Sequence, residues 1–330
     1  MSVFQGTVCL DITRTVSRAG AGAPSGVDRV ERAYIREVLE AEEPLFLSRV
    51  LGGFVLLDGA AMRTFLRMAD APDALDGPDM LSRLGGRQTL GQKRAESTVR
   101  RLAKSFARRA KLTALLKAAA PGGFDFLTVG HSNQSPKVYA GVRSAGARRV
   151  VTLVHDVIPL DYPEFSRPAA VPRFTTQFKA MAGESHLLIF NSAYTEARAR
   201  HWMQGLGVDC ATATALLGCD PLPNALTGPT DAPAHPNFVV LGTIEPRKNH
   251  ILLLNIWRRF HDTMAPDAIP HLHIVGRRGW ENENVVDVLE RAPFMGQTVF
   301  EHGFLSDEEL AALLQGATAL LFPSFVEGFG

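Results

Sequence analysis

Residues 237–260 read NFVVLGTIEPRKNHILLLNIWRRF, which is a short apolar run, a glycine, a basic pair and an amphipathic run. The first part predicts a buried strand ending at Gly242, and the apolar residues of 249–260 have helical spacing. Arg247 and Lys248 stand where that helix is predicted to begin, beside free backbone N–H groups. Because the amino end of a helix is already positive, a basic pair there indicates a site for an anion such as a phosphate; a solvated surface is the alternative.

The same alternation of apolar runs and helical patterns extends over the rest of the chain. Near-continuous apolar strands separated by helices are typical of parallel sheets covered on both faces. We therefore expect an α/β fold with two Rossmann-like domains that face a cleft. The further predicted strands are TVCLDI, GGFVLLDG, FDFLTVG, RRVVTLVHDVIP, SHLLIFNS, LHIVG, QTVFEHGF and TALLFPS.

A proline-rich segment marks the predicted boundary between the domains. Residues 218–236, GCDPLPNALTGPTDAPAHP, contain five prolines in nineteen residues, a density typical of a linker. The predicted domains are therefore 1–217 and 237–330. Ligands of open α/β sheets bind outside the carboxyl ends of the strands, so we look for the site there.

Composition narrows the class of protein. The chain has 330 residues, 46% hydrophobic and 21% charged, and a formal net charge of +1, which gives no general attraction to nucleic acid. The three cysteines have no paired spacing, which favours a reducing compartment. The first residues lack a signal-peptide pattern, and no apolar run is long enough to cross a bilayer. The sequence therefore predicts a cytoplasmic protein.

Residues 87–117 form a strongly basic segment. They contain ten Lys and Arg residues against the single acid Glu96, with apolar residues at helical spacing, which predicts a basic amphipathic helix. A solvated helix face is one reading of this segment. A peripheral contact with anionic lipid at the inner face of the membrane is the second, and nucleic-acid binding is disfavoured because stacking aromatics are missing.

Three further positions are candidate site residues. His155 is the first polar residue after the predicted strand at 150–154, where a residue lining a cleft would be found. Gly26 precedes the predicted helix at 27–41, which suits close approach of a phosphate or sugar to the backbone. Glu327 is followed by Gly328 and precedes Gly330 in EGFG, after the last predicted strand. A structural histidine and a plain turn are the alternatives at 155 and 327.

Taken together, these segments resemble the GT-B-fold retaining glycosyltransferases of family 4, also called group 1. The resemblance rests on PSGVDRVERAY, VHDVIPLDYPE, FNSAYTEARAR, LGTIEPRKNHILLL, HIVGRRGW and HGFLSDEELAALLQGATALLFPSFVEGFG, which occur in this order over nearly the whole chain.

The resemblance implies that 1–217 is the acceptor-side domain and that 237–330 binds the nucleotide-sugar, and it implies roles for the candidate residues. Arg247 and Lys248 match the basic pair that binds the donor diphosphate, and Gly26 matches the glycine turn before the first helix. His155 matches the histidine that approaches the donor sugar, and Glu327 matches the first glutamate of the family's E-x7-E element. The backbone of Phe329 and Gly330 would follow Glu327 along the sugar.

The sequence departs from the family pattern at two places. Many members carry a basic residue directly after the strand-end glycine, where this chain has Thr243. The second glutamate of E-x7-E would fall at position 335, beyond Gly330, so we expect the second domain to be incomplete and truncated at its C-terminus.

The implied activity is transfer of a hexose, with mannose as one candidate, from a nucleotide-sugar to a hydroxyl of a glycan or lipid-linked acceptor, with retention, in surface polysaccharide biosynthesis. No cofactor is implied. No D-x-D occurs and the histidines of HLH (271–273) have no further ligands nearby in sequence, so no metal is predicted. The alternatives are a catalytically silent sugar-nucleotide-binding domain and a dinucleotide-dependent oxidoreductase with a loose glycine motif at Gly20, Gly22 and Gly26.

Overall fold

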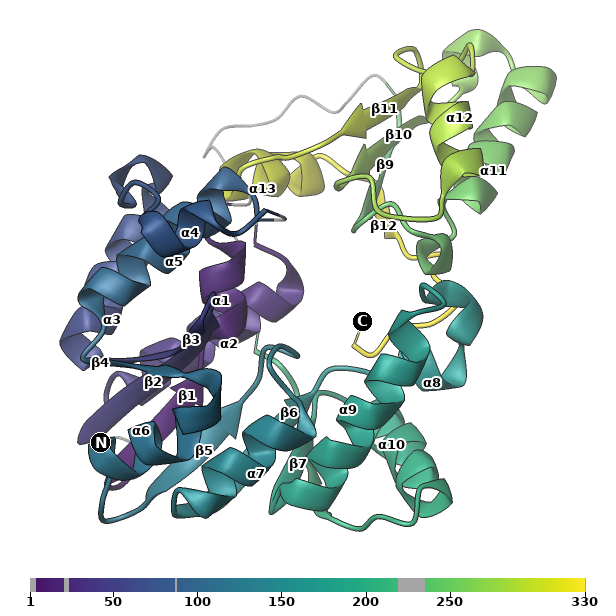
Figure 1. Ribbon diagram of the computed structural model, residues 1–330. Helices are drawn as coiled ribbons and strands as arrows, with labels where there is room; N and C mark the ends of the chain where they lie inside the picture. Colours follow the sequence, from purple (N-terminus) through teal and green to yellow (C-terminus); the bar gives the residue numbers. More distant parts are fainter. Residues whose placement is uncertain (1–3, 21–23, 87, 219–234, 330) are drawn as a thin grey trace. The chain divides into compact units, whose positions relative to one another are not determined.

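The computed structural model describes residues 4–20, 24–86, 88–218 and 235–329. The chain divides into two compact units, Met1–Leu217 together with Gly328–Gly330, and Gly218–Glu327. Figure 1 shows a sheet with flanking helices in each unit. Residues 219–234 of the predicted linker lie outside the described residues.

The first unit is built on an eight-stranded sheet with the order β4-β3-β2-β1-β5-β6-β7-β8. Its strands are β1 (Thr7–Asp11), β2 (Glu43–Val50), β3 (Gly53–Asp58), β4 (Ser105–Arg108), β5 (Phe124–Thr128), β6 (Ala147–Val154), β7 (Leu187–Phe190) and β8 (Ala211–Thr214). Among these strands only β3 runs against its neighbours, so this sheet is mixed rather than wholly parallel as predicted. The reversal is a tight β2–β3 hairpin, in which Gly52 has the positive φ of 92° that such turns require.

Helices cover both faces of this sheet. One face packs against α6 (Leu112–Ala119), α7 (Pro136–Ser144), α9 (Ala170–Glu184) and α10 (Ala193–Gly205), and the other against α1 (Thr13–Arg18), α2 (Gly26–Val38), α3 (Gly59–Asp70) and α5 (Leu90–Leu102). The short helices are α4 (Met80–Arg83) and α8 (Ile158–Asp161). Burial on both faces explains why the central strands are apolar runs rather than alternating ones.

The second unit has a four-stranded parallel sheet with the order β11-β10-β9-β12. Its strands are β9 (Asn237–Leu241), β10 (His271–Val275), β11 (Val299–His302) and β12 (Ala319–Leu321), and its helices are α11 (His250–Thr263), α12 (Glu283–Arg291) and α13 (Asp307–Gln315). Leu254 and Trp257 of α11 and Val285 and Leu289 of α12 pack against the sheet in a separate core. The α/β class and the two Rossmann-like domains are confirmed.

Five 3-10 turns complete the described secondary structure. They are Pro72–Ala74, Arg109–Lys111, Pro163–Phe165, Pro246–Lys248 and Pro266–Ala268. No helix in the described ranges is both long and apolar enough to cross a membrane.

The prediction of one basic amphipathic helix over 87–117 is wrong. Arg87 lies outside the described residues, α5 ends at Leu102, and the chain then forms the edge strand β4, a 3-10 turn and α6. Phe106, expected on the apolar helix face, lies on β4 and is 46% exposed. Several of the cations are also held in ion pairs, as Arg100 is with Asp79 and Glu96.

Candidate active site

The candidate site in the second unit lies where β9 and β12 end. Since these strands are parallel neighbours, the loops that follow them begin at the same edge of the sheet. The backbone N–H of Phe325 donates to the carbonyl of Arg247 at 2.9 Å, and the Asn249 side chain donates to the carbonyl of Pro323 at 3.2 Å. The two loops are therefore joined to each other along their length.

Arg247 and Lys248 converge on the carboxylate of Glu327. Arg247 Nη1 donates to Glu327 Oε2 and Lys248 Nζ donates to Glu327 Oε1, each at 2.5 Å. Glu245 binds the same arginine from the other side, with 2.6 Å between its Oε1 and Arg247 Nε. The structure thus brings together three of the predicted residues and adds Glu245. The anion at the basic pair is the chain's own carboxylate.

The local backbone differs from the prediction. Arg247 and Lys248 lie in the 3-10 turn Pro246–Lys248, and α11 begins only at His250 after Asn249 turns the chain with a φ of 56°. The N–H groups of Lys248 and Asn249 donate to Glu245 and Pro246 within this turn. The expectation of free N–H groups beside the pair is therefore wrong at these positions, because the turn uses them.

Gly242 makes the space that Lys248 occupies. A Cβ at Gly242 would lie 3.3 Å from Lys248 Cε and 3.5 Å from Lys248 Nζ, and the φ of Gly242 is 143°. On another side, the ammonium lies 5.2 Å from the centroid of the Phe322 ring, within reach of a cation–π contact. The strand-end glycine thus lets the lysine fold back over the sheet towards Glu327.

The two carboxylates of this cluster differ in their titration. Burial alone would raise the pKa of Glu327, but hydrogen bonds from Lys248 and Ser324 and the charge of Arg247 hold that pKa below its ordinary value. Burial raises the pKa of Glu245 despite the nearby Arg247 and Lys248, and the charge of Glu327 adds to the rise. Glu327 is therefore the carboxylate that the cations keep ionised.

In the first unit, His155 follows β6 directly, as predicted, but its ring is buried rather than open. Its Nε2 lies 2.7 Å from the carbonyl oxygen of Val129, so Nε2 carries the proton. Its backbone N–H donates to His131 Nε2 at 3.1 Å, and the two rings meet edge to face at 4.9 Å. Burial lowers the pKa of both imidazoles, and His131 must be neutral at Nε2 to accept the bond from the His155 N–H.

A polar cluster surrounds this pair at the ends of β1 and β5. Asp11 Oδ2 accepts from Asn133 Nδ2 at 2.7 Å, and Glu31 Oε2 accepts from the hydroxyl of Thr15 at 2.9 Å. Glu31 is fully buried, and burial together with the charge of Asp11 raises its pKa to about 8. Arg14 pairs with Asp28 of α2 at 2.6 Å.

Gly26, Gly328 and Phe329 lie within the described residues. Gly26 is the first residue of α2 rather than the residue before it, and no atom lies within 4 Å of a Cβ built there, so its approach is open. The carbonyl of Gly328 accepts from the Ser192 hydroxyl at 2.6 Å, and a Cβ at Gly328 would lie 2.2 Å from the carbonyl oxygen of His155. Phe329 is 42% exposed, and Gly330 lies outside the described residues.

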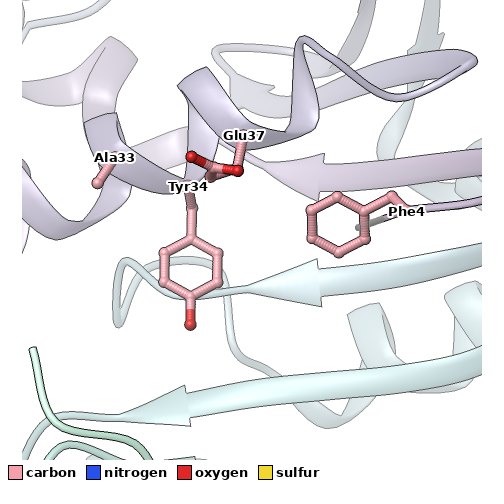
Figure 2. A pocket seen from close by; sticks show the side chains of 4 residues that line it. All are labelled: Phe4, Ala33, Tyr34 and Glu37. Atoms are coloured by element: carbon pink, nitrogen blue, oxygen red, sulfur yellow. The ribbon is translucent and has the colours of Figure 1, made fainter. Parts of the chain in front are cut away.

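A cavity of about 260 Å³ opens elsewhere on the first unit. Figure 2 shows its lining, with Tyr34, Ala33 and Glu37 on α2 and Phe4 from the segment before β1. None of the predicted site residues lines it, so it is separate from the candidate site.

Histidines also gather on β10 and β11. His273 Nδ1 lies 3.0 Å from His302 Nε2, and the His271 ring stacks on His235 with 4.7 Å between centroids. Burial and the neighbouring imidazoles lower the pKa of His273 to about 4. Within the described ranges, no group of three or more His, Cys, Asp or Glu side chains is placed to hold a metal ion.

Comparison with known proteins points to the second unit. Residues 232–330 match the family model described as "Glycosyl transferases group 1". This glycosyl transferases group 1 match contains the whole cluster of Glu245, Arg247, Lys248 and Glu327.

Two relatives from Escherichia coli carry related names. The serotype-specific mannosyltransferase WbdA is 31% identical over 210 residues, which cover 57% of this chain and 24% of that protein. The O-antigen chain mannosyltransferase B is 36% identical over 90 residues, which cover 27% of this chain and 23% of that protein. The chain thus spans about a quarter of the length of the curated relatives it matches.

Solved structures support the fold. The trehalose-6-phosphate synthase OtsA superimposes with a TM-score of 0.56 at 11% identity, covering 98% of this chain and 80% of that one. A second structure, of apo OtsA, gives a TM-score of 0.53 at the same identity. At this identity the likeness shows the fold alone, which is the GT-B arrangement of two Rossmann-like domains.

Sequence reasoning missed two residues that the structure places at the candidate sites. Glu245 stands two positions before Arg247, and an acidic residue so near a predicted anion-binding pair is a signal that could have found it. His131 directly follows the apolar run FDFLTVG, three residues after β5 ends, and a polar residue after an apolar run is the signal that singled out His155. Both signals were present in the sequence.

Proposed function

We propose that this protein transfers a hexose, with mannose as the first candidate, from a nucleotide-sugar to a hydroxyl of a glycan or lipid-linked acceptor in surface polysaccharide biosynthesis. The group 1 match over residues 232–330 and the similarity to the two mannosyltransferases support this activity. The observation that carries the proposal is the convergence of Arg247 and Lys248 on Glu327 at the end of β9.

The basic pair suits a diphosphate leaving group. As the bond to the sugar breaks, the diphosphate gains negative charge, and donors already aimed at that charge lower the barrier. An ammonium has three N–H donors, and Glu327 takes one of those of Lys248, so the same group can bind a phosphate oxygen. In this proposal the two side chains supply the charge that a metal ion provides in other transferases, and no cofactor takes part.

Glu327 is proposed to accept a hydrogen bond from a hydroxyl of the transferred sugar. An ionised carboxylate is the stronger acceptor, and the adjacent cations favour that form. Transfer with retention, and the donor-sugar contacts of His155, Gly26, Phe329 and Gly330, stay predictions that rest on the family 4 resemblance. A cytoplasmic location, with peripheral contact at the inner face of the membrane, is proposed on the same footing.

Substitution of the basic pair tests the activity. We expect Arg247→Ala and Lys248→Ala each to lower turnover by about tenfold or more, because each removes a donor to the leaving group. Turnover is measured as release of nucleoside diphosphate from a panel of nucleotide-sugars, with circular dichroism as a check on folding. Arg259→Ala, an exposed cation on α11, is the matched control.

Normal turnover in both variants would remove the diphosphate assignment. A nucleotide-sugar could instead stabilise the protein against heat while no acceptor mixture releases nucleoside diphosphate. That result would identify a catalytically silent sugar-nucleotide-binding domain. Reduction of a nicotinamide cofactor, measured by its absorbance, would instead identify the protein as an oxidoreductase.

A further inference from the structure

A cluster of exposed arginines lies at the carboxyl edge of the first sheet. Arg49 is next to the last residue of β2, Arg109 follows β4 directly, and Arg173 lies near the start of α9. All three side chains are exposed. We call Arg49, Arg109 and Arg173 the edge arginines.

The sheet register explains why the edge arginines come together. Arg49 of β2 pairs with Phe54 of β3, and Phe54 pairs with Ala107 of β4, so these three positions share one face of the sheet. Phe54 belongs to the core formed with α6 and α9. Arg109 stands just before α6, so the ends of β2 and β4 bring two of the arginines to this face; Figure 1 shows α6, α7 and α9 covering it.

Arg173, the third edge arginine, lies next to the polar cluster around His131 and His155. Phe174, the residue after Arg173, lies 6.2 Å from the ring of His131, measured between centroids. The backbone N–H of Arg49 donates to the hydroxyl of Thr13 at 2.9 Å, directly after β1. Arg49 and Arg173 therefore lie beside the ends of β1 and β5, and Arg109 lies at the end of β4 on the same edge, where open α/β sheets bind ligands.

The charges of the edge arginines are not balanced by partners. Among the described residues none of the three makes an ion pair, whereas Arg14, Arg100 and Arg198 of the same unit each do. Partial desolvation and the charges of Arg109 and Arg173 lower the pKa of Arg49, although Asp11 and Glu96 act in the opposite direction. Both of those carboxylates already accept bonds, from Asn133 and from Arg100.

Like charges that act on one another in this way repel, and an anion bound among them removes the repulsion. A guanidinium group offers a planar fork of N–H donors that fits phosphate oxygens, and three such groups neutralise a phosphate ester or a diphosphate. We propose that the edge arginines form a binding site for a phosphate group, and that this phosphate belongs to the acceptor. The phosphate site stands on the geometry alone, whereas its assignment to the acceptor rests on the proposed glycosyl transfer.

The first test measures inorganic pyrophosphate binding by calorimetry in a Lys248→Ala background, which removes the proposed donor site. We expect Arg49→Gln, Arg109→Gln and Arg173→Gln each to weaken binding by about three- to tenfold, and the triple variant to abolish it. The control is Arg36→Gln, which removes an exposed cation in the last turn of α2 and is expected to keep the affinity for pyrophosphate. Substitution of the same three arginines by lysine keeps the charge, and an intermediate affinity is expected.

Two results would overturn the phosphate site. One is an affinity for pyrophosphate in the triple variant equal to that of the Arg36→Gln control. The other is a triple variant that binds pyrophosphate as the parent chain does but no longer sediments with phosphatidylglycerol vesicles, with phosphatidylcholine vesicles as the uncharged reference. That result assigns the cluster to a membrane surface.

The donor test is separate. Thermal stabilisation by nucleotide-sugars is expected to be equal in the parent chain and in a triple arginine variant that keeps Lys248. If no nucleotide-sugar stabilises the parent chain, the proposed function fails, and the pyrophosphate result still decides the phosphate site.

Discussion

Lys248 reaches Glu327 through space that Gly242 leaves open, and the position of Gly242 depends in turn on Gly276. Gly242 leaves room for the lysine stem, and Gly276 lets β9 and β10 end in close contact. A Cβ at Gly276 would lie 1.9 Å from the carbonyl oxygen of Gly242, a backbone atom that cannot move aside. The position of the Lys248 ammonium therefore depends on the close backbone contact between the ends of β9 and β10, as well as on the lysine itself.

Glu31 gives a prediction at the residue scale. Its pKa is raised from 4.5 to about 8 by burial and by Asp11, so the folded chain holds a proton that the unfolded chain has lost. The free energy of unfolding is then expected to fall as pH rises between these two values, by at most about 1.4 kcal/mol per pH unit. Glu31→Gln removes this dependence. Its stability relative to the parent chain is expected to rise from pH 6 to pH 8 and to level off above.

Urea denaturation at a series of pH values checks this expectation, since titrations common to both chains cancel in the comparison. Glu37→Gln, on the exposed face of the same helix, is the matched control. A difference between Glu31→Gln and the parent chain that stays constant over this pH range would show that Glu31 is ionised in the folded state.

At the scale of elements, strands were predicted best from the sequence where an apolar run is covered on both faces of the sheet. β1, β5, β6, β7, β9 and β10 are apolar runs of this kind and were found. β4 and β8 are edge strands of four residues, SFAR and ATAT, with little apolar content, so periodicity gives them no signal. The helical spacing within 87–117 was real up to Leu102, but it could not show that β3 offers an open edge to residues 105–108.

The end of α5 gives a prediction at this scale. Arg100 is 9% exposed and binds Asp79 at 2.7 Å and Glu96 at 3.0 Å, which joins α5 to α4. We expect Arg100→Met to lower the free energy of unfolding by about 2–4 kcal/mol, because it leaves the buried Glu96 carboxylate without its cation. Arg101→Met, which removes the neighbouring but 54% exposed partner of Asp76, is the control, with an expected change below about 1 kcal/mol.

The pH dependence sharpens the comparison. Hydrogen bonds from Arg100 hold the pKa of Asp79 at about 2, below its ordinary value of 3.8. The stabilisation is therefore present at neutral pH and is lost as pH falls from about 4 towards 2, so the difference between Arg100→Met and the parent chain is expected to shrink over that range. Equal losses for Arg100→Met and Arg101→Met at pH 7 would contradict the role of the buried pair.

At the scale of the molecule, topology decided which predicted residues meet. Arg247 and Glu327 are eighty positions apart, and they come together because β12 returns to lie beside β9. Strand-end chemistry could be predicted from the sequence, since a polar residue after an apolar run marks the carboxyl edge. The sequence also held signals for Glu245 and His131 as residues, but not for their bonds to Arg247 and His155, because those bonds depend on side-chain packing after the strands end.

The cores give the last prediction. Leu188 lies in a core built only from the first unit, and Leu272 in a core built only from the second, and both side chains are fully buried. Truncation of a buried leucine to alanine costs about 2–5 kcal/mol. We expect Leu272→Ala to accelerate amide hydrogen exchange in β9 and β10 while leaving β5–β7 unchanged, and Leu188→Ala to show the reverse. Exchange by mass spectrometry resolves the two units, and equal acceleration in both by either variant would show that they unfold as one cooperative structure.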